Sequence, residues 1–178
     1  MENMQKLEII LSGVGGQGLL MAGNILGKAA SSEGKKAAMT TVYGVETRGT
    51  FTKSDVIISS EEIDFPEVLS ADVVIALDVI AYKRYVGTLG QKTLLIYDSS
   101  FEKEPSQSTQ VCYPMLGTAE QAGSRNMANI VALGILIKHT SVVEAESVRD
   151  SIKDEFFDSP QVLEQNIKAF DTSLNLVD

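Results

Sequence analysis

The sequence predicts an α/β protein in which a mainly parallel sheet is flanked by helices. Apolar runs of strand length alternate with helix-patterned segments over the first hundred residues. Two of these runs, 73–77 and 93–97, have the continuous apolar character of buried parallel strands. A glycine-rich turn joins the first strand to the first helix, as in a Rossmann-like unit. Beyond residue 116 the pattern is helical, so we expect a helical C-terminal part.

Each expected element follows from a local pattern. The apolar stretch 7–11 predicts the first strand, and a stripe of leucine and alanine predicts a helix from Gln17 to about Ser32. Residues 126–138 leave few polar positions, and Gly134 there permits close contact with a neighbouring backbone. Further strands are expected at 36–42, 53–59, 73–77, 93–97 and 110–113, and further helices at 66–69, 79–86, 118–122, 126–138, 143–157 and 161–174.

Length and composition indicate one domain over residues 1–178. Membrane-spanning segments need about 18 apolar residues, and no run reaches that length. The first residues lack the pattern of a signal peptide, so a cytoplasmic protein is expected. The single cysteine, Cys112, excludes an internal disulfide and cannot supply the four thiolates of an iron–sulfur cluster or structural zinc. The net charge of −9 argues against nucleic acid as a partner.

The most informative motif is the turn Gly13-Val14-Gly15-Gly16-Gln17-Gly18. Its glycines permit a sharp turn and let an anion approach the amides at the start of a helix. Residues 1–53 hold six basic and four acidic groups, so the rest of the chain carries −11 and repels anions more strongly. Scatter of surface charge explains that difference equally well. A tight turn without a ligand therefore stays an alternative to an anion site.

A dinucleotide site needs an acid about 20 residues beyond such glycines, at the end of the second strand. Residues 37–41 contain none. Glu33 comes too early, Glu46 lies in the following loop, and no arginine precedes Arg48 after that strand. A freestanding NAD(P)-binding reductase is therefore disfavoured, although it remains an alternative beside a coenzyme A or nucleotide-binding module.

Other residue types that carry chemistry are few. The only histidine, His139, falls at the end of a buried helix and is interpreted as a helix-end cation or polar cap. Cys112 has no histidine near it in sequence, so a nucleophilic role is disfavoured. The carboxylates at 144–158 alternate with Arg149 and Lys153, which is typical of a solvated helix face. The sequence thus predicts neither catalytic residues nor a metal site.

Together with the loop Tyr43-Gly44-Val45-Glu46-Thr47-Arg48-Gly49-Thr50, the glycine turn makes the chain resemble the gamma subunit of 2-oxoacid:ferredoxin oxidoreductases. That family shows strand-Gly-x-Gly-Gly-Gln-Gly-helix and then Tyr-Gly-Pro-Glu-x-Arg-Gly-Gly. Here Val45 replaces the proline and Thr50 the last glycine. Residues 54–59, the strand ending at Asp78 and the helix start at 125–127 agree as well. The resemblance covers residues 7–140.

The resemblance implies a complex in which a 2-oxoacid and coenzyme A give acyl-CoA and carbon dioxide while ferredoxin takes the electrons. This chain would be a noncatalytic subunit, or one that encloses the active site. Thiamine diphosphate, magnesium and iron–sulfur clusters are expected on partner subunits of the alpha, beta and ferredoxin-like types. The thiamine motif Gly-Asp-Gly is indeed absent here. The residues do not identify the 2-oxoacid, although 2-oxoglutarate is weakly favoured.

The resemblance also proposes contact residues, either to coenzyme A or another anion or across a subunit interface. For Glu46 and Arg48 an intersubunit ion pair is favoured over a contact to substrate or coenzyme A, because a loop with both charges suits complementary contacts. Whether the turn touches coenzyme A stays open. The candidates are Gly13, Gly15, Gly16, Gln17 and Gly18 in the turn, and Tyr43, Glu46 and Arg48 in the loop.

Overall fold

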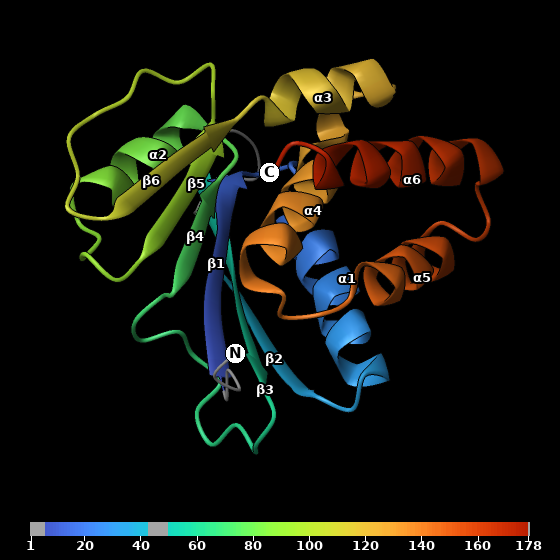
Figure 1. The fold of residues 1–178 in the computed structure, drawn as a ribbon, viewed down its shortest axis with the longest axis horizontal. Coiled ribbons are helices and arrows are strands. Elements are labelled where there is room, and N and C mark those ends of the chain that lie inside the picture. Colours follow the sequence, from blue (N-terminus) through green and yellow to red (C-terminus); the bar gives the residue numbers. More distant parts are fainter. Residues whose placement is uncertain (1–5, 43–49, 178) are drawn as a thin grey trace.

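The computed structural model describes residues 6–42 and 50–177, and in them a six-stranded sheet has helices on both faces (Figure 1). The strand order is β2-β3-β1-β4-β5-β6. The pairs β1–β4, β4–β5 and β5–β6 are parallel, whereas β3 is antiparallel to both β1 and β2. The α/β class is confirmed. The strands are β1 (Lys6–Val14), β2 (Lys36–Val42), β3 (Phe51–Ser59), β4 (Val73–Ala76), β5 (Leu94–Asp98) and β6 (Thr109–Tyr113).

The direction of β3 separates this sheet from a simple alternation of strands and helices. A parallel neighbour needs a crossover of a dozen or more residues, and the segment between β2 and β3 is too short for one. β3 therefore turns back and inserts between β2 and β1, with Phe51 opposite Val14 and Ser59 opposite Lys6. The start of β3, and not the end of β2, is thus the neighbour of β1 at the carboxyl edge of the sheet.

The helices are divided unequally between the two faces. α2 covers one face, over a small apolar cluster around Tyr82, and the other helices gather on the opposite face over the main core (Figure 1). No helix among the described residues is long and apolar enough to cross a membrane. The helices are α1 (Leu19–Ser32), α2 (Val79–Val86), α3 (Met115–Ala122), α4 (Ala128–Thr140), α5 (Ala145–Glu155) and α6 (Pro160–Leu174), with a 3-10 turn η1 (Arg125–Met127).

The helix expected at 66–69 is wrong, because this segment is irregular. Its polar backbone groups are bound by neighbouring strands instead. The Glu8 carboxylate accepts hydrogen bonds from the amides of Leu69 (3.0 Å) and Ser70 (3.1 Å), and the Thr40 hydroxyl donates to the Pro66 carbonyl at 2.9 Å. Since these groups are already partnered by β1 and β2, a helical turn has little left to stabilise it.

Helix α4 is the centre of the main core, and Gly134 sets its contact with α6. Residues 128–137 of α4 are all buried. A Cβ at Gly134 would overlap the Ser173 side chain and lie 3.2 Å from the Phe170 carbonyl oxygen. The expected close approach of a neighbouring backbone at Gly134 is confirmed.

We therefore expect Gly134→Ala to destabilise the fold by about 1–3 kcal/mol, because the added methyl forces α4 and α6 apart. Gly27→Ala is the matched control in another helix. Its Cβ would meet only the Ala37 methyl at 3.7 Å, an ordinary contact, so this change should stabilise by about 0.5–1 kcal/mol. Chemical denaturation of both variants measures the difference. Equal effects would show that the α4–α6 contact is not tightly packed.

Candidate functional site

The glycine turn connects the carboxyl end of β1 to α1 through a short hydrogen-bonded path. The Gln17 amide donates to the Val14 carbonyl at 3.2 Å, and the Gly15 amide donates to the Thr50 carbonyl at 3.1 Å. Gly16 and Gly18 have φ of 97° and 69°. Side chains with a Cβ rarely adopt such angles, so two of the glycines are required by the backbone alone.

The Gln17 side chain closes the inner side of this turn. Its Oε1 accepts from the Val14 amide at 2.9 Å, and its Nε2 donates to the Leu77 carbonyl at 3.1 Å. A Cβ at Gly13 would overlap Oε1, so the glycine makes room for the amide group. Gln17 therefore joins the ends of β1 and β4. Its role within the described residues is a bridge inside the fold.

A second amide, Asn129, holds the start of α1 from the other side. Its Nδ2 donates to the Gly18 carbonyl at 3.0 Å, and its Oδ1 accepts from the Ile130 amide at 2.9 Å. The residue is 4% exposed. A Cβ at Gly18 would lie 2.5 Å from Nδ2. Sequence reasoning missed Asn129, although a lone amide in the most apolar helix is a signal that could have marked it.

The described residues leave the outer side of the turn open. Gly16 is exposed, and a Cβ there would meet none of their atoms within 4 Å. Among the described residues, no side chain caps the start of α1 and no acid lies in its first turn. In the described part of the chain, nothing therefore opposes the positive dipole at the amide end of this helix, which is the condition for an anion site at a helix start. It lies between the carboxyl ends of β1 and β4, where the strand order reverses.

The residues on either side of segment 43–49 of the second motif lie beside the glycine turn. Tyr43, Glu46 and Arg48 lie outside the described residues. The flanking residues are Val42 at the end of β2 and Thr50 before β3, both at the carboxyl edge of β1. The hydrogen bond from the Gly15 amide to Thr50 fixes one flank directly against the glycine turn. Topology thus brings the two motifs to one edge of the sheet.

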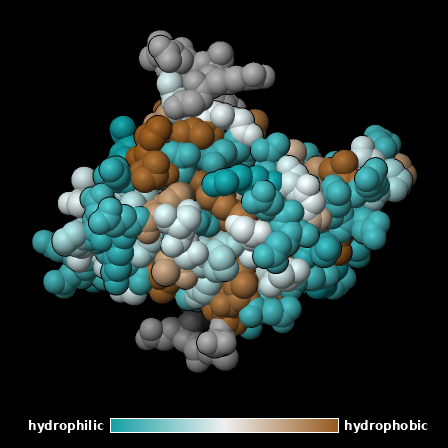
Figure 2. Space-filling model, turned by 90° about the horizontal axis from the view of Figure 1, so that it is seen from above, coloured by the Kyte–Doolittle hydropathy of each residue, from teal (hydrophilic) through white to brown (hydrophobic). Residues whose placement is uncertain are grey.

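This edge also carries exposed apolar side chains. Leu20 begins α1, Val42 ends β2, and Val79 and Ile80 begin α2, and each is exposed. Seen from above, hydrophobic surface appears in several separate groups among hydrophilic ones (Figure 2). Isolated exposed apolar residues are ordinary, but four large ones around one turn favour a protein contact there.

The surroundings of β1 do not provide a ribose site. Its neighbour at the carboxyl edge is Phe51, whose ring lies under the Arg84 guanidinium at 4.3 Å. The buried acid of β3, Asp55, is bound by the Lys53 ammonium at 2.6 Å, although its Oδ1 has no hydrogen-bond partner in residues 6–42 and 50–177. A carboxylate engaged with lysine inside the fold does not present itself to a ribose hydroxyl, which weakens the dinucleotide alternative.

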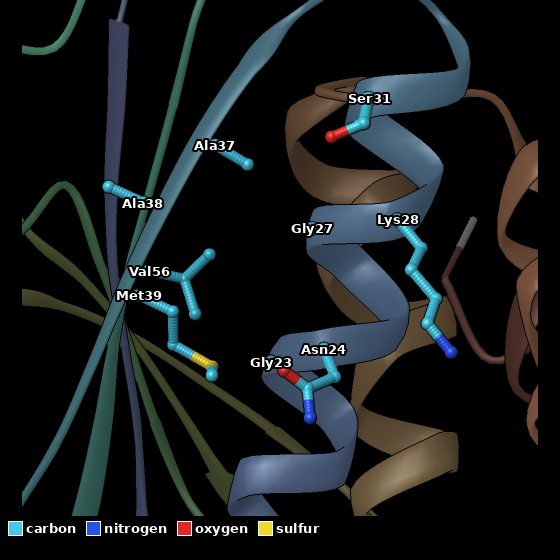
Figure 3. Close-up of a pocket in the computed structure, with 9 residues that line it drawn as sticks. All are labelled: Gly23, Asn24, Gly27, Lys28, Ser31, Ala37, Ala38, Met39 and Val56. Atoms are coloured by element: carbon cyan, nitrogen blue, oxygen red, sulfur yellow. The ribbon is translucent and has the colours of Figure 1, made fainter.

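A groove of about 430 Å³ lies between α1 and β2, away from the open side of the turn (Figure 3). Met39 and Val56 reach from the sheet toward Gly23, and Ala37 faces Gly27. The Lys28 side chain points away from the strands and pairs with Glu155 at 2.9 Å. The groove therefore marks where small residues let α1 approach β2, and it gathers few polar groups for chemistry.

The other residues considered for chemistry in the sequence are His139 and Cys112. The His139 ring nitrogen Nε2 lies 2.7 Å from the Tyr113 hydroxyl, and burial lowers the pKa of the imidazole. The lowered pKa disfavours a charged ring at neutral pH, so of the two expected roles, helix-end cation or polar cap, the structure favours the polar one. Cys112 is exposed. In residues 6–42 and 50–177, no three His, Cys, Asp or Glu side chains are grouped to hold a metal ion.

Fold and site together define a class of protein. It is an α/β protein with a Rossmann-type glycine turn, in which the side-chain amides of Gln17 and Asn129 bind the backbone on the inner side of the turn. Residues 8–176 match the model of the pyruvate ferredoxin/flavodoxin oxidoreductase family. The chain therefore belongs to this family.

Two relatives named as 2-oxoglutarate synthase subunits align over most of their length. The chain is 38% identical over 169 residues to the 2-oxoglutarate synthase subunit KorC of Methanocaldococcus jannaschii, covering 92% of this chain and 89% of that protein. It is 36% identical over 180 residues to KorC of Methanothermobacter thermautotrophicus, covering 96% and 94%.

Solved structures agree with this assignment. The gamma subunit of a keto/oxoacid ferredoxin oxidoreductase from Geobacter sulfurreducens superposes with a TM-score of 0.78 at 32% identity, covering 95% of this chain and 99% of that one. The 2-oxoglutarate:ferredoxin oxidoreductase of Magnetococcus marinus, with 2-oxoglutarate, coenzyme A and succinyl-CoA bound, gives a TM-score of 0.88 at 26% identity. The match covers 97% of this chain but only 31% of that longer chain.

The close approach of Gly18 and Asn129 predicts a coupled effect on stability. Gly18→Ala should cost about 2 kcal/mol, from the positive φ and from overlap with the Asn129 amide. In an Asn129→Ala background the overlap is gone, and the same change should cost only about 1 kcal/mol. A double-mutant cycle by chemical denaturation measures both. The same cost in the two backgrounds would contradict the contact.

Proposed function

We propose that this chain is the gamma-type subunit of a 2-oxoacid:ferredoxin oxidoreductase. The complex converts a 2-oxoacid and coenzyme A to acyl-CoA and carbon dioxide and passes the electrons to ferredoxin. The family match over residues 8–176 carries the proposal. Full-length alignment to a separate gamma subunit supports it further.

Among 2-oxoacids we favour 2-oxoglutarate. The relatives named as 2-oxoglutarate synthase subunits reach 38% and 36% identity to the chain, and another of them is 32% identical. Ketoisovalerate oxidoreductase subunit VorA of Methanothermobacter marburgensis is 28% identical, and the pyruvate/ketoisovalerate common gamma subunits of Thermococcus kodakarensis and Thermococcus litoralis are 30% and 32% identical. The ranking supports the C5 dicarboxylate, which other subunits of the complex would contact.

The chemistry belongs to partner subunits in this proposal. Within residues 6–42 and 50–177 no three His, Cys, Asp or Glu side chains are grouped to hold a metal ion, and the one thiol of the chain cannot supply an iron–sulfur cluster. Thiamine diphosphate, magnesium and iron–sulfur clusters would lie on the alpha, beta and ferredoxin-like subunits. A single cysteine also suits a reducing compartment, so we place the complex in the cytoplasm.

The contribution of this chain is then to enclose the active centre at the carboxyl edge of its sheet. The open amide end of α1 is suited to a phosphate of coenzyme A. The exposed side chains of Leu20, Val79 and Ile80 beside it suit a contact with the partner that binds thiamine. The second motif, with Glu46 and Arg48, follows Val42 at the same edge and would complete this interface.

Copurification tests the assignment. Chain tagged at the C-terminus and isolated from its native cells should bring down thiamine-binding and cluster-containing subunits in fixed stoichiometry, and the preparation should reduce ferredoxin with 2-oxoglutarate and coenzyme A. A solitary chain with tight NAD(P)H would instead indicate a freestanding reductase. A solitary chain with bound coenzyme A or nucleotide would indicate a binding module outside any decarboxylase.

The coenzyme A contact has a separate test in the complex. Gly16→Ala puts a methyl group on the open side of the turn and should raise the KM for coenzyme A several-fold with a smaller effect on kcat. Gly34→Ala is the control, since Gly34 also has positive φ (77°) and open space around its Cβ, but follows the far end of α1. If the two variants have the same KM, the turn does not contact coenzyme A.

A further inference from the structure

A strongly acidic loop lies at the opposite edge of the sheet from the glycine turn. Residues 60–72, which we name the acidic loop, connect β3 to β4 at the amino end of the parallel strands (Figure 1). They contain five carboxylates, and no lysine or arginine occurs from 54 to 82. Nothing in the proposed function uses this surface.

The acidic loop is held in place by its neighbours. The Glu8 carboxylate binds the amides of Leu69 and Ser70, and the Glu8 amide donates to the Asp72 carboxylate at 2.8 Å. The Val68 and Ala71 side chains pack against the smaller apolar cluster. The loop is therefore ordered by contacts with β1 and the core, and ordering it on binding would cost little entropy.

The charge state of Glu8 supports its hydrogen bonds to the acidic loop. Burial is the largest influence and opposes ionisation, but hydrogen bonds from Lys6 and from the amides of Ser70 and Leu69 outweigh it and lower the pKa of Glu8. The carboxylate is thus ionised at neutral pH and accepts both amides. Its stabilising effect is lost only as the pH falls through this lowered pKa.

The ordered loop nevertheless presents two large apolar side chains to solvent. Leu69 is 79% exposed and Phe65 is 51% exposed. Asp64 and Glu67 flank them and have no ion-pair partner among the described residues, whereas Glu62 pairs with Lys36 at 2.9 Å. Apolar side chains that stand on an ordered backbone and are flanked by charges have the arrangement of an interface anchor.

We propose that the acidic loop docks onto a basic protein surface with an apolar pocket, on another subunit of the complex in which the proposed function places this chain. Phe65 and Leu69 enter the pocket, while Asp64 and Glu67 meet lysine or arginine at its rim. A second copy of this chain is disfavoured, because a two-fold contact through the loop opposes like charges. Nucleic acid and anionic membranes repel the same carboxylates.

The test uses the assembled complex, with an affinity tag on a partner subunit. Phe65→Ser combined with Leu69→Ser should lower the retained amount of this chain at least tenfold at limiting concentration. Asp64→Lys combined with Glu67→Lys should weaken retention and reduce its dependence on salt. Because all four side chains are exposed, the unfolding midpoint of the free chain should not change.

Phe157→Ser is the matched control, because Phe157 is 78% exposed in the turn between α5 and α6. It should leave retention unchanged. If loop variants are retained like wild type, or if Phe157→Ser weakens retention as much, the docking surface is wrong while the proposed function stands. If wild-type chain is not retained at all, the proposed function fails and this inference fails with it.

Discussion

The side-chain amide of Gln17 is the contact on which the carboxyl edge of this protein depends. One of its atoms binds the amide of Val14 and the other binds the carbonyl of Leu77, so a single group joins the ends of β1 and β4. These two strands lie where the strand order reverses, and α-helices start beyond each of them. Without this bridge a partly buried amide and a carbonyl would lose their side-chain partner, and the ends of β1 and β4 would no longer be joined at this point.

Local patterns were enough to predict the fold class, most elements and the packing role of Gly134. They were not enough where a partner lies far away in sequence. The hydrogen bond between Asn129 and Gly18 joins residues 111 positions apart in sequence, and the one between Leu69 and Glu8 joins residues 61 positions apart. Such contacts override local preference, as in the acidic loop, where backbone groups that a helix would use are already bound by strands.

The candidate site was predicted unevenly for a similar reason. Spacing identified the glycine turn, and the resemblance identified its companion loop, since both are contiguous motifs. The inward role of Gln17 could not be predicted, because the residue type is equally suited to a ligand and to the backbone. The positions of Gly13 and Leu77 in the fold show that the side chain binds the backbone. The antiparallel direction of β3, which brings Thr50 beside Gly15, could not be predicted either. The hydrophobic pattern predicts where strands occur but not how they are ordered or directed in the sheet.

The insertion of β3 has a consequence for how the chain is made. β1 is synthesised before both of its hydrogen-bonding neighbours, which come from later sequence at 51–59 and 73–76. The nascent β1 has two open edges until β3 has emerged, and one edge stays open until β4 has followed at residue 76. An unpaired apolar strand can pair with other chains, so slow translation before β4 would prolong the exposure of β1 to aggregation.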